Sequence, residues 1–260
     1  MNPCKSHKII FNIQNKLINE GILTTNEITS AIKIQKWVRG CLLRLNRLPL
    51  IMYKIQAFLK TQLFDFSTQN DDGRINSCND ETEVIKLLVE MFGCKIKIPK
   101  IRMWYDILAL DNMVGWIPIN IKTTTTATSD NTGNLAMCVY AYTDEILDIH
   151  REKSYESGPM SIILFDKLKH KKYNTNHKKD YYFIVLNKTV QSDIIVNSVK
   201  GLSILTPNIN NLPFQVCWNK NRTFKYARIQ EKIKLFIYCL QKPRMSWKES
   251  FMSNVRTLDL

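Results

Sequence analysis

The sequence lacks the patterns that define several large classes of protein. None of its apolar runs approaches the roughly 20 residues that a membrane-spanning helix needs. No long apolar stretch with a small-residue cleavage site follows Lys5 and Lys8, so we expect an intracellular rather than a secreted protein. The seven cysteines contain no C-x-x-C pair, and the four histidines are equally dispersed. These absences argue against a disulfide framework and against a structural zinc site.

Acidic residues are few relative to basic ones. The 37 Lys and Arg residues oppose 23 Asp and Glu residues, which gives a formal net charge of +14 and a pI near 9.4. Such an excess favours a polyanionic partner, with nucleic acid first and an anionic membrane surface second. Solvated lysines in a basic proteome would give the same balance. Residues 1–60 are the most basic part, with ten Lys or Arg and two acids, a net charge of +8.

Apolar residues recur at helical spacing through residues 1–66, which favours a helical extension. We expect three helices there, ending near Gly21, Arg47 and Phe64, and Thr24 with Glu27 forms a possible capping box for the second. A polar stretch begins at Ser67 and marks a soft boundary. The predicted organisation is therefore a basic extension over 1–66 and a core domain over 67–260.

The core domain mixes helical and strand patterns without a repeat or a regular βαβ alternation. We expect helices near residues 79–93, 131–142 and 224–240, and strands near 103–110, 116–126, 160–165, 181–186 and 193–196. A turn at Asp111, Asn112 and Gly115 would join the first two strands as a hairpin. The sequence therefore predicts an α/β or α+β core with a helical N-terminal extension.

Polar side chains fall at matching places on the two strands of this hairpin. Asp106 lies near the start of the first strand, and Asn120 and Lys122 lie two apart on the second. Residues two apart in a strand share a face, so pairing around the turn can place all three together. Upstream, Gly73, Arg74 and Ser77 lead into a helix that bears Glu81, Glu83 and Glu90.

This arrangement resembles the active site of the PD-(D/E)xK nuclease superfamily, and particularly that of type II restriction endonucleases. Their pattern is an aspartate, a variable spacer, then an acid, any residue and a lysine, often completed by a glutamate from a preceding helix. Asp106 and Lys122 match the pattern, and Glu81 matches the helix glutamate best, with Glu83 second. Asn120 departs from it, because an amide oxygen can bind a hard cation but has no charge.

The resemblance extends over about residues 70–240 and implies a mixed β-sheet flanked by helices. It also implies Mg²⁺-dependent hydrolysis of both strands of DNA at a specific sequence. Asp106 and Glu81 would hold Mg²⁺, Asn120 would bind or support it, and Lys122 would act on the attacking water. A homodimer on a palindromic site and a paired DNA methyltransferase are further implications. The departure at Asn120 keeps a catalytically inactive DNA-binding protein open as an alternative.

Side chains suited to base recognition are concentrated in residues 208–222. Asn and Gln can bind adenine, and Arg or Lys can bind guanine, in the major groove. The candidates are Asn208, Asn210, Asn211, Gln215, Lys220 and Arg222. A polar loop without DNA contacts would have the same composition. The segment 166–180, rich in Lys and Asn, is expected to contact phosphates instead.

A second motif lies in the extension. Ile34, Gln35, Arg39, Gly40 and Arg44 match the IQ pattern, I/L-Q-x-x-x-R-G-x-x-x-R, which resembles binding sites for calmodulin-type EF-hand proteins. A basic amphipathic helix of this kind suits an acidic, methionine-rich groove. We favour a helix that packs beside the core, contacts DNA phosphates or supports a dimer, because an EF-hand-binding adaptor has no need of the predicted catalytic residues.

Overall fold

The computed structural model divides the chain into two compact units, Met1–Arg47 and Leu48–Leu260. It describes residues 21, 24, 26–35, 47–66, 73–100, 103–151, 153–208, 212–240 and 251–254, with the backbone alone at 73–75. Among these residues no helix is both long and apolar enough to cross a bilayer.

The first unit contains a helix over residues 26–35. At its start, the backbone N–H of Thr24 donates to Glu27 Oε2 (2.7 Å), and the backbone N–H of Glu27 donates to Thr24 Oγ1 (3.3 Å). This reciprocal pair confirms the predicted capping box. The first expected helix, before Gly21, lies outside the described residues.

The second unit begins earlier than the boundary expected after residue 66, because it includes helix α3 (Leu50–Leu59). Ile51, Met52, Ile55 and Leu59 of α3 are buried in the core of this unit. Polar contacts also fix the helix: the Gln56 side-chain amide donates to the Ile194 carbonyl (2.6 Å), and the Ile51 N–H donates to Asp111 Oδ2 (3.0 Å). The apolar face of α3 is therefore part of the domain core.

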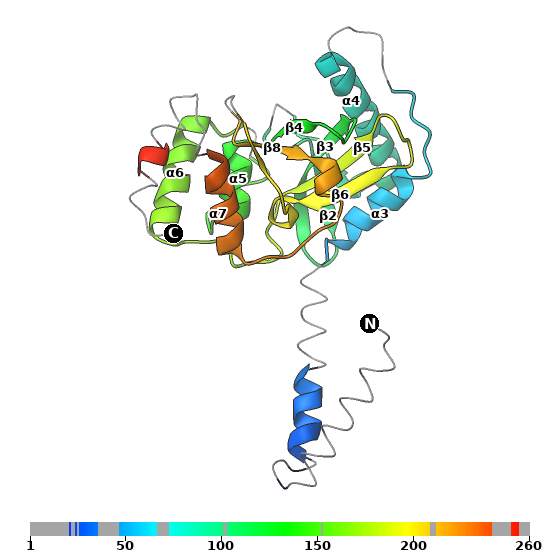
Figure 1. The fold of residues 1–260 in the computed structure, drawn as a ribbon. Coiled ribbons are helices and arrows are strands. Elements are labelled where there is room, and N and C mark those ends of the chain that lie inside the picture. Colours follow the sequence, from blue (N-terminus) through cyan, green and yellow to red (C-terminus); the bar gives the residue numbers. More distant parts are fainter. Residues whose placement is uncertain are drawn as a thin grey trace. The chain divides into compact units, whose positions relative to one another are not determined.

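A five-stranded mixed sheet is at the centre of this unit (Figure 1). Its order is β1 (Ile96–Lys97), β2 (Ile107–Asp111), β3 (Gly115–Thr124), β5 (Tyr182–Asn187) and β6 (Ile194–Ser198). Only the β3–β5 pair is parallel, and the other pairs are antiparallel. The chain returns from β3 to β5 through β4 and the helices α5 (Leu135–Tyr142) and α6 (Ser157–Lys169).

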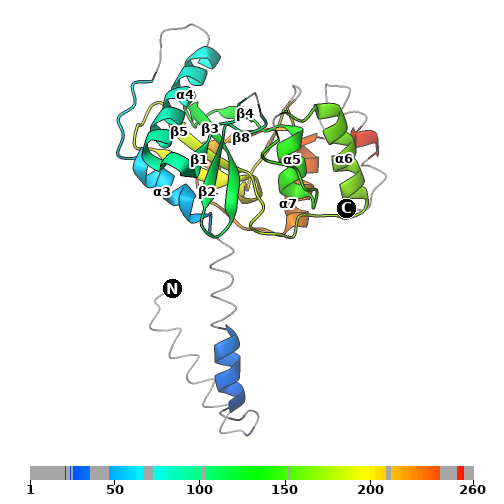
Figure 2. The ribbon, with the colours of Figure 1, turned by 180° about the vertical axis from the view of Figure 1, so that it is seen from behind.

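Helices cover both faces of the sheet, as the two opposite views show (Figures 1 and 2). On one face α3 and α4 (Gly73–Phe92) pack against apolar residues that include Ile117, Ile119 and Ile121. On the other face α5, α6 and α7 (Ile229–Leu240) share a core with Phe183 and Val185. The mixed α/β architecture expected from the sequence is confirmed.

A smaller antiparallel sheet joins the second face. Its order is β4 (Ser129–Thr132), β8 (Phe214–Cys217) and β7 (Thr206–Pro207). This unit also contains three short 3₁₀ helices, η1 (Gly93–Lys95), η2 (Val199–Gly201) and η3 (Trp218–Lys220), and a helical turn at residues 251–254. The small sheet is important for the site because β4 directly follows the loop after β3.

The predicted hairpin and two later strands are confirmed. Asp111 pairs with Gly115 across the turn, and Gly115 has a φ of 87°, a conformation that glycine adopts at little cost. Strands β5 and β6 lie within one or two residues of their expected bounds. Gly93, with a φ of 53°, follows the last residue of α4, as expected for a helix C-terminus.

Several other helices and strands differ from the prediction, either in the type of element or in its first residue. Residues 160–165, expected as a strand, belong to helix α6, where Met160, Leu164 and Leu168 recur every four residues on the buried side. A six-residue apolar window does not distinguish a buried strand from a helix. Helix α4 begins at Gly73 rather than near residue 79, and β2 begins at Ile107 rather than at 103. Helices α5 and α7 begin later than expected, at Leu135 and Ile229.

Candidate active site

The site forms where β3 continues beyond the end of β2. Their pairing stops at Ile107 and Ile119, and residues 120–124 of β3 go on pairing with β5 on the other side. Asp106, directly before β2, occupies the open position. Its Oδ2 accepts the backbone N–H of Ile121 at 2.7 Å, a donor that a longer β2 would otherwise have used. Strand register therefore fixes this carboxylate against β3.

Asn120 also binds Asp106. Its Nδ2 donates to Asp106 Oδ2 at 2.6 Å, so both hydrogen bonds that this carboxylate accepts from described residues end on one oxygen. The arrangement leaves Oδ1 available for a ligand. It favours a supporting role for Asn120 over direct metal binding through the amide, because its nitrogen faces the carboxylate.

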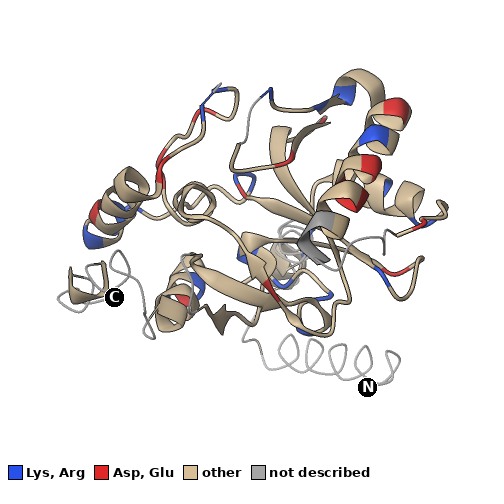
Figure 3. Ribbon diagram, turned by 90° about the horizontal axis from the view of Figure 1, so that it is seen from above, with Lys and Arg blue, Asp and Glu red and all other residues tan. Residues whose placement is uncertain are grey.

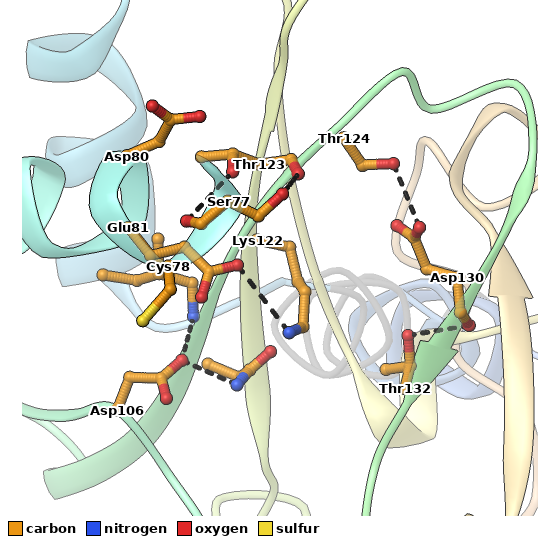
Figure 4. A network of polar contacts seen from close by, with 12 residues as sticks. Ser77, Cys78, Asp80, Glu81, Asp106, Lys122, Thr123, Thr124, Asp130 and Thr132 are labelled. Atoms are coloured by element: carbon orange, nitrogen blue, oxygen red, sulfur yellow. Dashed lines mark hydrogen bonds and ion pairs between the residues drawn. The ribbon is translucent and has the colours of Figure 1, made fainter. Parts of the chain in front are cut away.

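Glu81 reaches the same place from α4. Its Oε1 lies 3.7 Å from Lys122 Nζ, and both side chains are about three quarters buried. The helix is fixed to the sheet nearby, since the Ser77 hydroxyl donates to the Thr123 carbonyl at 3.3 Å. Figure 4 shows Glu81, Asp106 and Lys122 converging from α4, the start of β2 and β3. Three of the predicted catalytic residues are thus brought together.

A buried ion pair supports this position of α4. Asp80, which is 4% exposed, lies 2.7 Å from the Lys188 ammonium group just after β5. Lys188 is itself attached to β3, because its backbone N–H donates to the Thr124 carbonyl (2.9 Å). Since Asp80 directly precedes Glu81, the pair helps to set the distance between α4 and the end of β3.

The two site acids have raised pKa values. Burial raises the pKa of Glu81 from 4.5 to about 7, and the nearby Asp106 charge adds to the increase, while Lys122 opposes it. Burial also raises the pKa of Asp106, against the opposing effects of the Ile121 N–H and the Lys122 charge. Two carboxyl groups that resist ionisation side by side are suited to a divalent cation, which stabilises both negative charges.

A cavity of about 350 Å³ opens beside these groups. Its lining comes from α4, β3 and β4 and comprises Ser77, Cys78, Glu81, Lys122, Thr123, Asp130 and Asn131. The small sheet therefore forms one wall of the site. The cavity is large enough for a phosphate group and several waters, since a water occupies about 30 Å³ in the liquid.

Asp130 is a further acid that lines this cavity, and its place there was not predicted from the sequence. Its Oδ1 accepts the Thr124 hydroxyl (3.0 Å) and its Oδ2 accepts the Trp218 indole N–H (2.9 Å). Burial raises its pKa, and these two hydrogen bonds and the Lys122 charge oppose the rise. In Figure 4 it lies on the other side of Lys122 from Glu81. The lysine thus has carboxylates on both sides.

Asn131 holds a defined orientation in the cavity wall. Its Oδ1 accepts two amide N–H groups, from Asn208 Nδ2 and from Gln215 Nε2, each at 2.9 Å. With the oxygen engaged by both neighbours, the Nδ2 group of Asn131 is the end left to donate. The small sheet therefore presents a hydrogen-bond donor beside Lys122.

The four predicted base-reading residues that the structure describes do not gather on one surface. Asn208 is fully buried, and Arg222 pairs with both carboxylate oxygens of Asp193 at 2.7 and 2.8 Å. The segment is also not a single loop, because it includes β8 and η3. Gln215 is part of the Asn131 cluster and Lys220 is exposed. Asn210 and Asn211 lie outside the described residues.

Only some of the lysines in segment 166–180 are free to contact phosphates, as the sequence had led us to expect of the whole segment. Lys167 forms ion pairs with Asp144 and Glu145, each at 2.8 Å. The Lys179 ammonium group donates to the carbonyls of Thr143 and Glu145, and burial lowers its pKa to about 8. These two lysines are engaged within the protein, whereas Lys169, Lys171, Lys172 and Lys178 are exposed.

The donor set fits Mg²⁺ as a cation that keeps several of its waters. Within the described residues no three His, Cys, Asp or Glu side chains are arranged as a metal site. Mg²⁺ is commonly bound through one or two carboxylates with water and substrate oxygens completing the shell. Asp106 Oδ1 and Glu81 could supply two such ligands, and their raised pKa values are compatible with a neighbouring cation.

Basic residues are spread over several loops and helices of the second unit (Figure 3). The positive charge is therefore not confined to one element of this unit.

One comparison with known proteins gave a match. Residues 28–46 match the IQ calmodulin-binding motif. No curated protein and no solved structure matched the chain. The match covers the pattern found in the extension, of which Arg39, Gly40 and Arg44 lie outside the described residues, and it says nothing about the second unit.

Proposed function

We propose that this protein is a Mg²⁺-dependent endonuclease that hydrolyses phosphodiester bonds in double-stranded DNA. The main support is that Glu81 and Lys122 line one cavity, while the Asp106 carboxylate is held against β3 near enough to raise the pKa of Glu81. The net charge of +14 adds support for a nucleic-acid substrate.

Each residue has a chemical task in this proposal. Asp106 Oδ1 and Glu81 hold the cation, and Asn120 fixes the Asp106 carboxylate through its hydrogen bond to Oδ2. Bound Mg²⁺ would polarise the phosphate and lower the pKa of a coordinated water. Lys122, between Glu81 and Asp130, orients the attacking water and stabilises the negative charge that develops on the phosphate.

The resemblance to type II restriction endonucleases supports a finer proposal. It implies cleavage of both strands at one short sequence by a homodimer, in a system that includes a DNA methyltransferase. Gln215 and Asn131, which are joined by a hydrogen bond beside the cavity, are the described side chains best placed for contacts next to the cut. Their polar ends come from β8 and β4 of the small sheet.

The decisive experiment is digestion of unmethylated DNA of known sequence with Mg²⁺ or Mn²⁺. We expect discrete fragments from the wild type and none from Asp106→Ala or Lys122→Ala. Glu81→Gln should lower cleavage at least 100-fold, and Glu83→Gln, a matched change at an exposed glutamate on α4, serves as the control. A folded protein that binds DNA and never cleaves it would refute catalysis and favour the inactive DNA-binding alternative.

A second candidate function rests on the IQ motif match. Residues 28–46 would bind a calmodulin-type EF-hand protein, since a basic helix suits an acidic groove. Calcium-dependent complex formation that Arg39→Glu with Arg44→Glu abolishes would support it. DNA cleavage unaffected by the same double variant would show that the two functions are separate.

A further inference from the structure

A second cavity, of about 140 Å³, lies at the β1–β2 side of the sheet. Four basic side chains line it: Lys97 of β1, Lys100 after that strand, and His150 with Arg151 from the loop before α6. Tyr105, the neighbour of Asp106, forms part of its wall. The cavity is therefore adjacent to the candidate active site along the chain.

Strand pairing connects the basic cavity to the candidate active site. Lys97 pairs with Leu108, and both residues line the cavity. Asp106 directly precedes β2, two residues before Leu108, and its backbone N–H donates to the Ile119 carbonyl of β3 (3.0 Å). The cavity and the site acid therefore both lie near the start of β2.

Two cations of this cavity, those of Lys97 and Arg151, lie over aromatic rings. The Lys97 ammonium group lies 4.2 Å from the centre of the Trp116 ring, and the Arg151 guanidinium carbon lies 4.5 Å from the centre of the Tyr155 ring. The His150 ring packs edge-on against Trp116 at 6.3 Å. An aromatic ring orients a cation without cancelling its charge.

The described residues that line the cavity include these four basic side chains and no acid. The loop that supplies His150 and Arg151 also contains acids, and Oδ1 of one of them, Asp148, accepts the backbone N–H of His150 at 2.8 Å.

We propose that this basic cavity binds a backbone phosphate of the DNA strand, close to the phosphodiester that lies at Asp106 and Lys122. The inference rests on the proposed function and names a contact that positions the substrate. An arginine fork and an ammonium group suit a phosphate, which gives affinity and register without base recognition.

The test is the salt dependence of duplex DNA binding, measured by fluorescence anisotropy in EDTA so that no cleavage occurs. Lys97→Ala with Arg151→Ala should weaken binding about tenfold or more and reduce the slope of log K against log salt by about one. The loss should be equal for unrelated sequences. Lys234→Ala, which removes an exposed charge from α7, should leave the slope unchanged.

A phosphate-by-phosphate comparison makes the test specific. Each phosphate around the cut is replaced in turn by a neutral methylphosphonate. We expect one of these replacements to weaken DNA binding by the wild type. The same replacement should cause no further loss of binding in the double variant. Arg151→Ala alone should show a partial effect, which keeps the test valid if the Lys97 change disturbs folding.

The outcomes separate the two proposals. Wild-type affinity and slope in a folded double variant would overturn the phosphate site, even if that variant still cleaves DNA. Binding that depends on Lys97 and Arg151 without any cleavage would uphold the phosphate site and refute the endonuclease. No binding of duplex DNA by the wild type would overturn both.

Discussion

The raised pKa of Glu81 makes a prediction about stability that does not depend on the function. Glu81→Gln replaces a largely buried carboxyl group with a neutral side chain of the same shape. In the folded protein the pKa of Glu81 is about 7, compared with 4.5 when it is exposed. An ionised Glu81 therefore destabilises the fold, and the glutamine should remove that cost.

The magnitude follows from the linkage between pKa and stability. The difference between 4.5 and about 7 corresponds to about 3 kcal/mol, because each tenfold change in proton affinity is worth about 1.4 kcal/mol. The cost is fully present above pH 7 and is lost as the pH falls toward 4.5, where the folded protein has already bound the proton. Glu81→Gln should therefore stabilise the protein by about 3 kcal/mol at pH 8 and by less than about 1 kcal/mol at pH 5.

Urea denaturation of wild type and variant at the two pH values measures this difference. The comparison at each pH removes the contribution of Asp130, which titrates in both proteins, whereas the coupling between Asp106 and Glu81 is part of the measured difference. Glu83→Gln is the matched control for loss of a carboxylate from α4. Equal effects of Glu81→Gln at pH 5 and pH 8 would refute the claim that burial against Lys122 and Asp106 raises this pKa.

Three further predictions concern the cation, the packing and the cavity wall. Mg²⁺ at 100 times its dissociation constant should raise the free energy of unfolding of the wild type at pH 8 by about 2.7 kcal/mol, as measured by thermal unfolding. The same Mg²⁺ concentration should stabilise Glu81→Gln much less. Gly201→Ala should cost about 1–3 kcal/mol because its Cβ would lie 2.2 Å from the Asn197 side chain, whereas Gly158→Ala, with open space in α6, should stabilise by up to about 1 kcal/mol. Asn131→Asp should lower cleavage at least tenfold, measured as single-turnover rate, because a carboxylate would replace the amide donor in the cavity wall; an unchanged rate would exclude contact with the phosphate.

Local patterns were enough to predict the centre of the site. Asp106 and Lys122 come from one hairpin, whose turn at Gly115 and strand alternation are properties of a short window of sequence. The sequence therefore predicted their shared face without knowledge of the rest of the fold. Only the resemblance to nucleases pointed to Glu81, because its contact with Lys122 joins a helix and a strand that are far apart in sequence.

The residues that were missed depend on long-range pairing. Asp130 is fixed in the cavity by Trp218, 88 residues away, and this contact exists because β4 pairs with β8. No window of sequence contains that pairing. Asn208 shows the opposite error, since its polarity indicated an exposed base-reading residue, while the small sheet buries it against Asn131. Polarity predicts exposure only when the fold leaves the hydrogen-bond partners to water.

The departure from the nuclease pattern at Asn120 has a structural explanation. Its Nδ2 lies 2.6 Å from Asp106 Oδ2, a contact that is favourable for an amide donor and repulsive for a second carboxylate. An aspartate at this position would place three acids with Glu81 in a largely buried site whose existing carboxyl groups already have raised pKa values. The amide keeps the site stable without a cation, at the expense of one charged ligand. Asn120→Asp should therefore destabilise the protein in EDTA and bind Mg²⁺ more tightly, and a loss of Mg²⁺ affinity in that variant would show that the amide oxygen itself is a ligand.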